Sequence, residues 1–308
     1  SFHNEKLTIT AKQASVKGVQ VHEVSAEIPD LAAVGGHLFL SGRAQGETQN
    51  FFRFLAASPL NAILASLPSR SRAEGTGELH LALDIPFADV EKTQVKGSYH
   101  FQGNRLQLLA DVPPLDHVKG TLWFDQQGLR IDGITLHALG GQSVLTAQRR
   151  SDGKLAFDVQ GDVNIRHVGQ RYLPAWLQPL LHGKTRHHTR FVIHDGLESL
   201  SVNSDLRGIE SQLPAPLTKP RLGILPFSLD WQQTTTPSSE VALQVKIAEH
   251  FAGQWALQGE QIRASTLHIG HSERPVLPRQ GSVIDVKSDE ASLDSWLALL
   301  APLGQQDD

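Results

Sequence analysis

The feature that most constrains this sequence is a two-residue alternation of apolar and polar side chains. The clearest early run alternates apolar Leu79, Leu81, Leu83 and Ile85 with His80, Ala82 and Asp84. Successive side chains of a β-strand point to opposite faces, so this run predicts a strand with one apolar and one wet face. Similar runs follow between turn-forming Gly, Asn and Pro residues, so residues 75–141 are predicted to form an antiparallel meander.

The same alternation returns later in the chain. The later runs contain Leu155, Phe157 and Val159, and then Val241, Leu243, Val245 and Ile247. Glycine interrupts several strand patterns, as at Gly97, Gly103 and Gly120. Such glycines indicate either bulges that curve a sheet or ordinary hairpin turns. We therefore predict an all-β-dominated fold, a long curved antiparallel sheet that forms an apolar groove and carries short α-helical inserts.

Three segments change to the spacing of a helix. The first is predicted to begin at Ser58-Pro59 and to end at Pro68, because Ser is a good cap and Pro suits the first turn. The second is predicted over residues 174–181, and the third after Ser292. The polar and basic residues 182–190 predict a loop between strands.

The helical segments are spaced roughly evenly along the chain. This spacing predicts one elongated, repetitive β structure over residues 1–308, with approximate units 1–70, 71–182 and 183–308. The prolines of residues 213–220 exclude a central strand there, because proline cannot donate to the hydrogen-bond ladder.

Composition excludes several classes of partner and cofactor. The chain has 308 residues, a formal net charge of -4 and a pI near 6.4, so no basic surface is expected to bind nucleic acid. It contains no Cys, which excludes disulfides and thiolate chemistry. It also contains no Met, so we expect an interior portion of a longer protein. The apolar windows are too short and too interrupted to span a bilayer.

No pattern of catalytic or cofactor-binding residues is found. Residues 141–145 lack the second Gly of a nucleophile elbow, and no dinucleotide or phosphate loop occurs. The densest histidine group contains His182, His187, His188 and His194, but its basic neighbours disfavour a cation and its spacing fits no metal motif. The carboxylates Asp84, Asp125, Asp132 and Asp158 fall on wet faces or in turns, which leaves a polysaccharide-active enzyme unsupported. We expect no catalytic residue, no metal and no cofactor.

Several segments, in the same order, carry a family resemblance. They are residues 53–60, 77–86, 118–124 with 139–141, 204–208 with 213–220, and 277–278 with 293–296. The most specific is Leu-Pro-Ala-Pro-Leu at 213–217, preceded by Ser-Asp-Leu-Arg-Gly at 204–208. Together they resemble the YhdP-type branch of the AsmA-like family of Gram-negative envelope proteins, whose full members are much longer and begin with a membrane anchor.

The resemblance implies a periplasmic β structure with an apolar groove, similar to bridge-like lipid-transfer proteins. It also implies phospholipid movement between inner and outer membranes, support of the outer-membrane permeability barrier, and an inner-membrane anchor outside this chain. The outer membrane or its proteins would be further partners. Each buried CH₂ contributes about 0.8 kcal/mol, so an acyl chain needs an apolar path through water. The predicted lining is Leu79, Leu81, Leu83, Leu155, Phe157, Val159, Val241, Leu243, Val245 and Ile247.

A second function class fits the same pattern. If the apolar faces are closed by sandwich packing or by the helices, the protein is a periplasmic scaffold or a regulator of envelope assembly with a filled β core. A filled core binds no lipid, so the exposure of the apolar faces distinguishes the two hypotheses.

Overall fold

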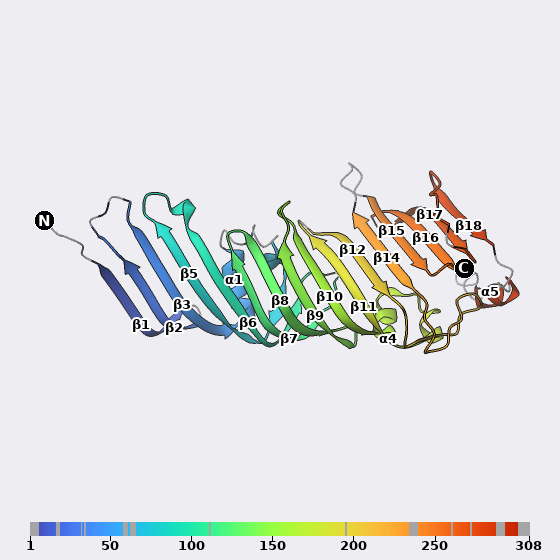
Figure 1. The fold of residues 1–308 in the computed structure, drawn as a ribbon, viewed down its shortest axis with the longest axis horizontal. Helices are drawn as coiled ribbons and strands as arrows, with labels where there is room; N and C mark the ends of the chain where they lie inside the picture. Colours follow the sequence, from blue (N-terminus) through green and yellow to red (C-terminus); the bar gives the residue numbers. More distant parts are fainter. Residues whose placement is uncertain are drawn as a thin grey trace, which may run out of the picture. The chain divides into compact units, whose positions relative to one another are not determined.

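The structure, a computed structural model, consists mostly of strands that belong to one long mixed sheet, and this sheet is not closed (Figure 1). It describes residues 6–16, 19–31, 33, 35–57, 61, 66–110, 112–194, 196–233, 240–259, 261–271, 273–287 and 293–300. The predicted fold class, a long sheet with short helical inserts, is confirmed.

The first elements are β1 (Leu7–Val16), β2 (Val19–Ile28), β3 (His37–Glu47), α1 (Thr48–Ala56), α3 (Leu67–Arg70), β4 (Arg72–Glu74), β5 (Thr76–Pro86), η1 (Val90–Lys92), β6 (Gln94–Gln107), β7 (Leu115–Asp125), β8 (Gly128–Ala138) and β9 (Gly141–Arg149). The later elements are β10 (Leu155–Asn164), α4 (Ile165–Tyr172), η2 (Gln178–Leu180), β11 (Leu181–Ile193), β12 (Leu197–Ser204), β13 (Ile209–Ser211), β14 (Phe227–Gln233), β15 (Glu240–Ile247), β16 (Phe251–Gln258), β17 (Gln261–Ile269), β18 (Gly281–Val286) and α5 (Leu293–Leu300).

The chain divides into two compact units. Unit 1 contains Ser1–Ala138, Gln142–Asp158 and Ile193–Gly196, and unit 2 contains Leu139–Gly141, Val159–Val192 and Leu197–Asp308. In unit 1, antiparallel pairs run from β1 through β2, β3, β5, β6 and β7 to β8. In unit 2, antiparallel pairs join β12, β14, β15, β16 and β17, whereas β18 pairs with β17 in parallel.

Bulges shift the pairing register between strands of unit 1, and so change which alternate residues face each side of the sheet. The register of β6 with β7 shifts around Gly103, and that of β7 with β8 shifts around Gly120. Both glycines have a positive φ, 104° and 133°, which a residue with a Cβ adopts with strain. The pattern at Gly103 and Gly120 therefore marks bulges, the first of the two predicted alternatives. Gly97 has another role, because a Cβ there would clash with the ring of Phe124.

The structure has a helix, α1, ahead of the first predicted helix, and most of residues 58–68 lies outside the described residues. α1 begins at Thr48, because Phe51 and Leu55 pack against the sheet and are 3% and 7% exposed. The predicted start at Ser58-Pro59 lies outside the described residues, and Pro68, predicted as the end, lies in the first turn of α3, where proline is tolerated.

Of the second predicted helix, over residues 174–181, only the short 3₁₀ helix η2 is present, and the α-helix α4 lies earlier in the chain. α4 is capped by Asn164, whose Oδ1 accepts a hydrogen bond from the Arg166 amide at 3.0 Å, and this cap favours a helix start at Ile165. The predicted loop over residues 182–190 is also wrong, since those residues lie in β11. The third helix is confirmed as α5, and its predicted cap Ser292 lies outside the described residues.

The proline-rich segment 213–220 forms no strand, as predicted. Its single lysine is buried: Lys219 is 5% exposed, and its Nζ donates to the carbonyl of Ile209 at 2.6 Å. Burial lowers the pKa of Lys219, and the charge of Asp205 opposes this shift. The indole Nε1 of Trp296 in α5 donates to the carbonyl of Ala215 at 2.9 Å, which holds α5 against this segment.

A buried polar network holds α1 on the sheet of unit 1. Asn104 is 1% exposed, and its Nδ2 donates to Thr48 Oγ1 at 2.7 Å and to the carbonyl of Thr76 at 2.9 Å. Its Oδ1 accepts from the Gln102 amide at 2.7 Å. The hydroxyls of Thr48 and Tyr99 are 2.8 Å apart and hydrogen-bonded. Side chains from α1 and β6, together with a backbone carbonyl of β5, thus satisfy one another inside an apolar surrounding.

Replacing Asn104 tests this network. We expect Asn104→Ala to lower the free energy of unfolding by about 1–3 kcal/mol, because its buried partners lose their hydrogen bonds. Urea unfolding followed by circular dichroism measures the change. Asn203→Ala is the matched control, since Asn203 is exposed on β12 and a surface substitution changes stability by about 0.5 kcal/mol at most. Equal effects of the two substitutions would contradict the role of Asn104.

Tyr99 gives the network a pH dependence. Burial raises the pKa of Tyr99 from 10.0 to about 12, and the hydrogen bond with Thr48 partly offsets this shift. Because the folded pKa is the higher one, the stabilisation is fully present below pH 10 and is lost as the pH rises through 12. We expect Tyr99→Phe to show a smaller loss of stability over this interval than the unsubstituted chain in unfolding measurements. Parallel pH profiles would contradict the prediction.

Candidate functional site

The candidate site in unit 1 begins with the side chains of β5. Leu79, Leu81 and Leu83 lie at alternate positions and therefore share one face, while Glu78 and His80 lie on the other. Leu79 is buried, and Leu81 and Leu83 are half-buried. The predicted alternation is thus present in the folded strand.

The register carries this face across neighbouring strands. Residues paired in antiparallel strands point to the same side of the sheet, so a cross-strand row has one facing. Three rows result: Ile9, Ala26, Leu40, Leu83 and Val95; Gly42, Leu81, Gly97, Phe124 and Leu129; and Ala44, Leu79, Tyr99, Leu122 and Ile131. Tyr99 contributes the only titratable side chain in these rows, which otherwise offer apolar contact alone.

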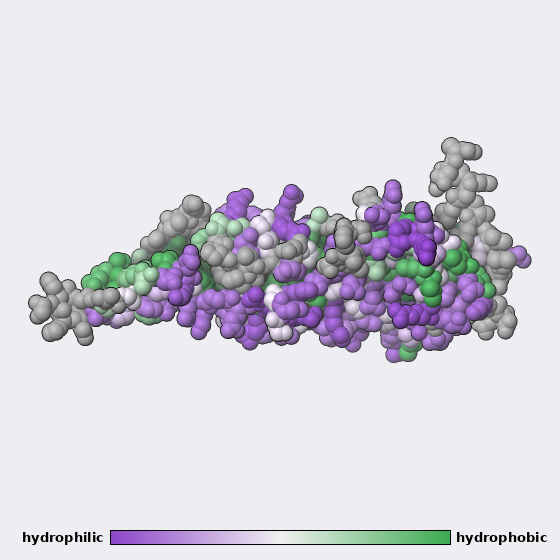
Figure 2. Space-filling model, turned by 90° about the horizontal axis from the view of Figure 1, so that it is seen from above, coloured by the Kyte–Doolittle hydropathy of each residue, from purple (hydrophilic) through white to green (hydrophobic). Residues whose placement is uncertain are grey.

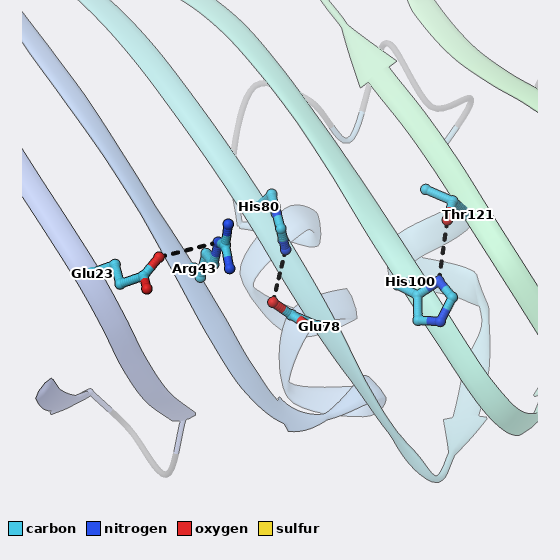
Figure 3. A network of polar contacts seen from close by, with 6 residues as sticks. All are labelled: Glu23, Arg43, Glu78, His80, His100 and Thr121. Atoms are coloured by element: carbon cyan, nitrogen blue, oxygen red, sulfur yellow. Dashed lines mark hydrogen bonds and ion pairs between the residues drawn. The ribbon is translucent and has the colours of Figure 1, made fainter. Parts of the chain in front are cut away.

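The opposite face of these strands is polar. Arg43 Nε lies 3.3 Å from Glu23 Oε2, and His80 Nε2 lies 2.7 Å from Glu78 Oε1 (Figure 3). His100 forms a hydrogen bond with the Thr121 hydroxyl on the same side at 3.1 Å (Figure 3). In the part of Figure 2 nearest the N-terminus, hydrophobic residues gather on one side and hydrophilic residues on the other. The sheet therefore has one apolar and one polar face.

Helices α1 and α3 cover part of the apolar face. Phe51 of α1 lies edge-on to Tyr99 with ring centroids 5.2 Å apart, and Tyr99 makes the same kind of contact with Phe101 at 4.8 Å. A cavity of about 90 Å³ lies between the helices and the strands, and its wall exposes only apolar surface. Phe157, one of the predicted lining residues, contributes to this wall. Here the apolar face is packed as a core.

Towards β1 the apolar face is exposed. Ile9 shares a row with Leu83 and is 58% exposed, and Leu7 is 40% exposed. Leu38 and Leu40 of β3 are half-buried. The face therefore changes from a closed core beneath α1 to an exposed apolar surface at β1.

Unit 2 carries a second apolar face on β15. Val241, Leu243, Val245 and Ile247 lie at alternate positions and are all half-buried, whereas Gln244 and Lys246 on the other face are exposed. Their cross-strand partners on β14 and β16 include four aromatic residues, which are half-buried as well. These are Phe227, Trp231, Phe251 and Trp255.

The ten predicted lining residues differ in exposure. Leu155 is 0% exposed, Phe157 4% and Leu79 7%, so these three are enclosed by protein. Val159, like the remaining six, is half-buried. The four aromatic partners on β14 and β16 are absent from the prediction. The parity of their strands would have identified them, because each lies at an alternating apolar position.

The histidines that lie closest together in the sequence are spread along β11 and the residue that follows it. His182 and His194 are exposed, and His187 of β11 forms a hydrogen bond with Thr189 at 2.8 Å. Burial lowers the pKa of His187, which disfavours its charged form. Among the described residues, no metal-ligating group of three includes these histidines. Within the same residues, no helix has the length and hydropathy needed to cross a bilayer.

Comparison of the chain with known proteins shows which family it belongs to. The chain is 23% identical over 306 residues to the "Intermembrane phospholipid transporter YhdP" of Escherichia coli (strain K12), and this match covers 97% of the chain. It spans 24% of the length of that relative. No solved structure matches. The profile of the YhdP protein family matches residues 1–308, which confirms the resemblance found in the sequence, and the chain belongs to this family.

Proposed function

We propose that this chain is a non-enzymatic segment of a phospholipid conduit that moves lipids between the inner and outer membranes and supports the outer-membrane permeability barrier. The observation that carries the proposal is a continuous apolar face, in register across neighbouring strands, that is exposed towards β1. The name of the Escherichia coli relative, an intermembrane phospholipid transporter, supports lipid as the ligand.

The apolar face suits acyl chains for a physical reason. Each CH₂ transferred from water to an apolar surface contributes about 0.8 kcal/mol, so an acyl chain is held without a polar anchor. The rows through Leu81 and Leu83 present similar aliphatic groups on successive strands. Because the contacts are alike, the free energy of a bound chain changes little from one row to the next. Sliding therefore needs no bond to form or break.

The proposed setting follows from the family. The segment would lie in the periplasm as part of a longer protein, whose inner-membrane anchor lies outside this chain. Phospholipid acyl chains are the proposed ligands, and the outer membrane or its proteins would be further partners. The three-unit division over residues 1–70, 71–182 and 183–308 stays a prediction of repeating architecture.

One observation favours a second function, a structural scaffold with a closed core. Leu155 and Phe157 are buried, and α1 covers the face next to Tyr99. Within this covered part, protein atoms occupy the place that a lipid would take. The exposure of Ile9 and the half-burial of Leu243 favour the conduit over the scaffold elsewhere.

Photocrosslinking tests the proposal. A photoreactive amino acid placed at Leu81 or at Leu243 in the full-length protein in cells is expected to yield phospholipid adducts, detected by mass spectrometry. His80 and Gln244 are the matched controls, because each neighbours a test position and lies on the opposite face. Adducts only at the controls would reverse the assigned facing. No adducts at any of the four positions in folded protein would favour the scaffold.

A charge on the apolar face gives a second test. Leu243→Glu is expected to weaken the permeability barrier of cells that depend on the full-length protein, because an acyl chain next to a carboxylate leaves that charge without water. Sensitivity to detergent or to a large antibiotic measures the barrier. Gln244→Glu adds the same charge on the exposed face and is expected to have no effect. An equal loss for both variants, at equal protein levels, would argue against an apolar path.

A further inference from the structure

A cluster of two histidines and one aspartate lies in unit 2, away from its apolar face. His268 is on β17, Asp285 is on β18, and His271 follows the end of β17. His268 alternates with Leu267 and Ile269, whose side chains share the face of Val245 and Ile247, so His268 lies on the opposite side. The proposed lipid path makes no use of this cluster.

The fold brings the three side chains together. His268 and Asp285 are paired residues of the parallel strands β17 and β18. The rings of His268 and His271 stack with centroids 4.4 Å apart and an angle of 24° between their planes. The Nε2 atom of His271 lies 3.4 Å from Asp285 Oδ2. One ligand atom from each residue lies within 4.8 Å of the other two.

The hydrogen bond of His268 suits a metal ligand. Its Nδ1 lies 3.1 Å from the carbonyl oxygen of Glu273, and a carbonyl can only accept, so Nδ1 carries the proton. In a neutral ring the lone pair is then on Nε2. Metal-binding histidines are commonly oriented in this way, with the second nitrogen donating to a carbonyl or carboxylate. A partner outside the ligand set thus orients His268.

The two ring nitrogens of His271 are buried and unsatisfied. Its side chain is 13% exposed, and neither ring nitrogen has a hydrogen-bond partner. A buried polar group without a partner costs about 1–3 kcal/mol, so it needs a physical explanation. A cation bound by one nitrogen would supply the missing interaction.

The charged side chains next to the cluster are compatible with a bound cation. Lys287 Nζ lies 3.8 Å from Asp285 Oδ2 and 3.5 Å from Glu273 Oε2, so it shares Asp285 with His271. A metal ion that takes Asp285 would displace Lys287 from one carboxylate and leave it the other. The two carboxylates balance the charge of Lys287 and leave one negative charge for the metal.

We propose that His268, His271 and Asp285 bind a Zn²⁺ ion, with water at the fourth position. Imidazole nitrogen and carboxylate oxygen are zinc ligands with bonds of about 2.0–2.2 Å, and a tetrahedron with such bonds separates its ligand atoms by about 3.4 Å. The three atoms must close by roughly 1.5 Å at most, which side-chain rotation supplies. The ion would link β18 to β17 and to His271, which lies between them in the chain.

Metal titration of the 308-residue chain tests the site. Zn²⁺ is added under calorimetry, and Co²⁺ is added as a spectroscopic probe whose visible absorption is intense in a tetrahedral site. We expect one tight equivalent per chain, a tetrahedral Co²⁺ spectrum, and a rise of the melting temperature with Zn²⁺. His271→Ala and Asp285→Asn are each expected to lower the affinity at least about tenfold and to remove the rise.

A second histidine pair provides the control. His117 and His137 of unit 1 have ring centroids 5.2 Å apart but belong to no three-ligand group among the described residues, so His137→Ala is expected to retain the tight equivalent. If His271→Ala fails to fold, the Zn²⁺ titration and the Co²⁺ spectrum of Asp285→Asn test the site instead. Identical isotherms for the unsubstituted chain and Asp285→Asn would overturn the site in favour of adventitious binding by surface histidines. No saturable binding would reduce the cluster to an ion pair between His271 and Asp285.

Discussion

The apolar faces of this protein depend on register, because a strand side chain keeps its facing only while the pairing of its strand is maintained. A slip of one residue moves every side chain to the other face. In β8 the apolar positions change from Leu129 and Ile131 to Ile134 and Leu136, and the exposed neighbours Asp132 and Gly133 mark the change. The sequence changes parity where the register shifts, so the large side chains stay on one face through the bulge.

Coverage by helices decides what this face can do. Beneath α1 the face is a core, closed by aromatic contacts and held by the hydrogen bonds of Asn104 and Thr48. At β1 the same face is exposed, as Ile9 shows. The same apolar face is therefore covered in one part and exposed in another. Lipid binding is proposed only where side chains such as Leu81 and Leu243 are not enclosed by protein.

The polar groups of the sheet are arranged according to the same alternation. On the wet face of unit 1, pairs such as Glu78 with His80 are partly exposed and contribute little to stability. The cluster around His271 differs, because both ring nitrogens of His271 are buried and form no hydrogen bond. Alternation of side chains thus separates an apolar face, proposed to bind lipid, from a polar face, on which unit 2 carries the proposed zinc site.

The sequence alone determined most of the strands and their apolar faces, because the two-residue period is a local property of each strand, but it missed β11. Its ordered segments also identified the family. It placed Leu79, Leu81 and Leu83 on one face, and likewise Val241 to Ile247. It did not locate α1 or α4, whose ends depend on packing and on a cap as well as on proline. Only the tertiary structure decided which apolar residues are enclosed, since burial of Leu155 but not of Leu243 depends on elements distant in the chain. It also brought His268 and His271 to Asp285, because a parallel pairing with β18 has no local signal in the sequence.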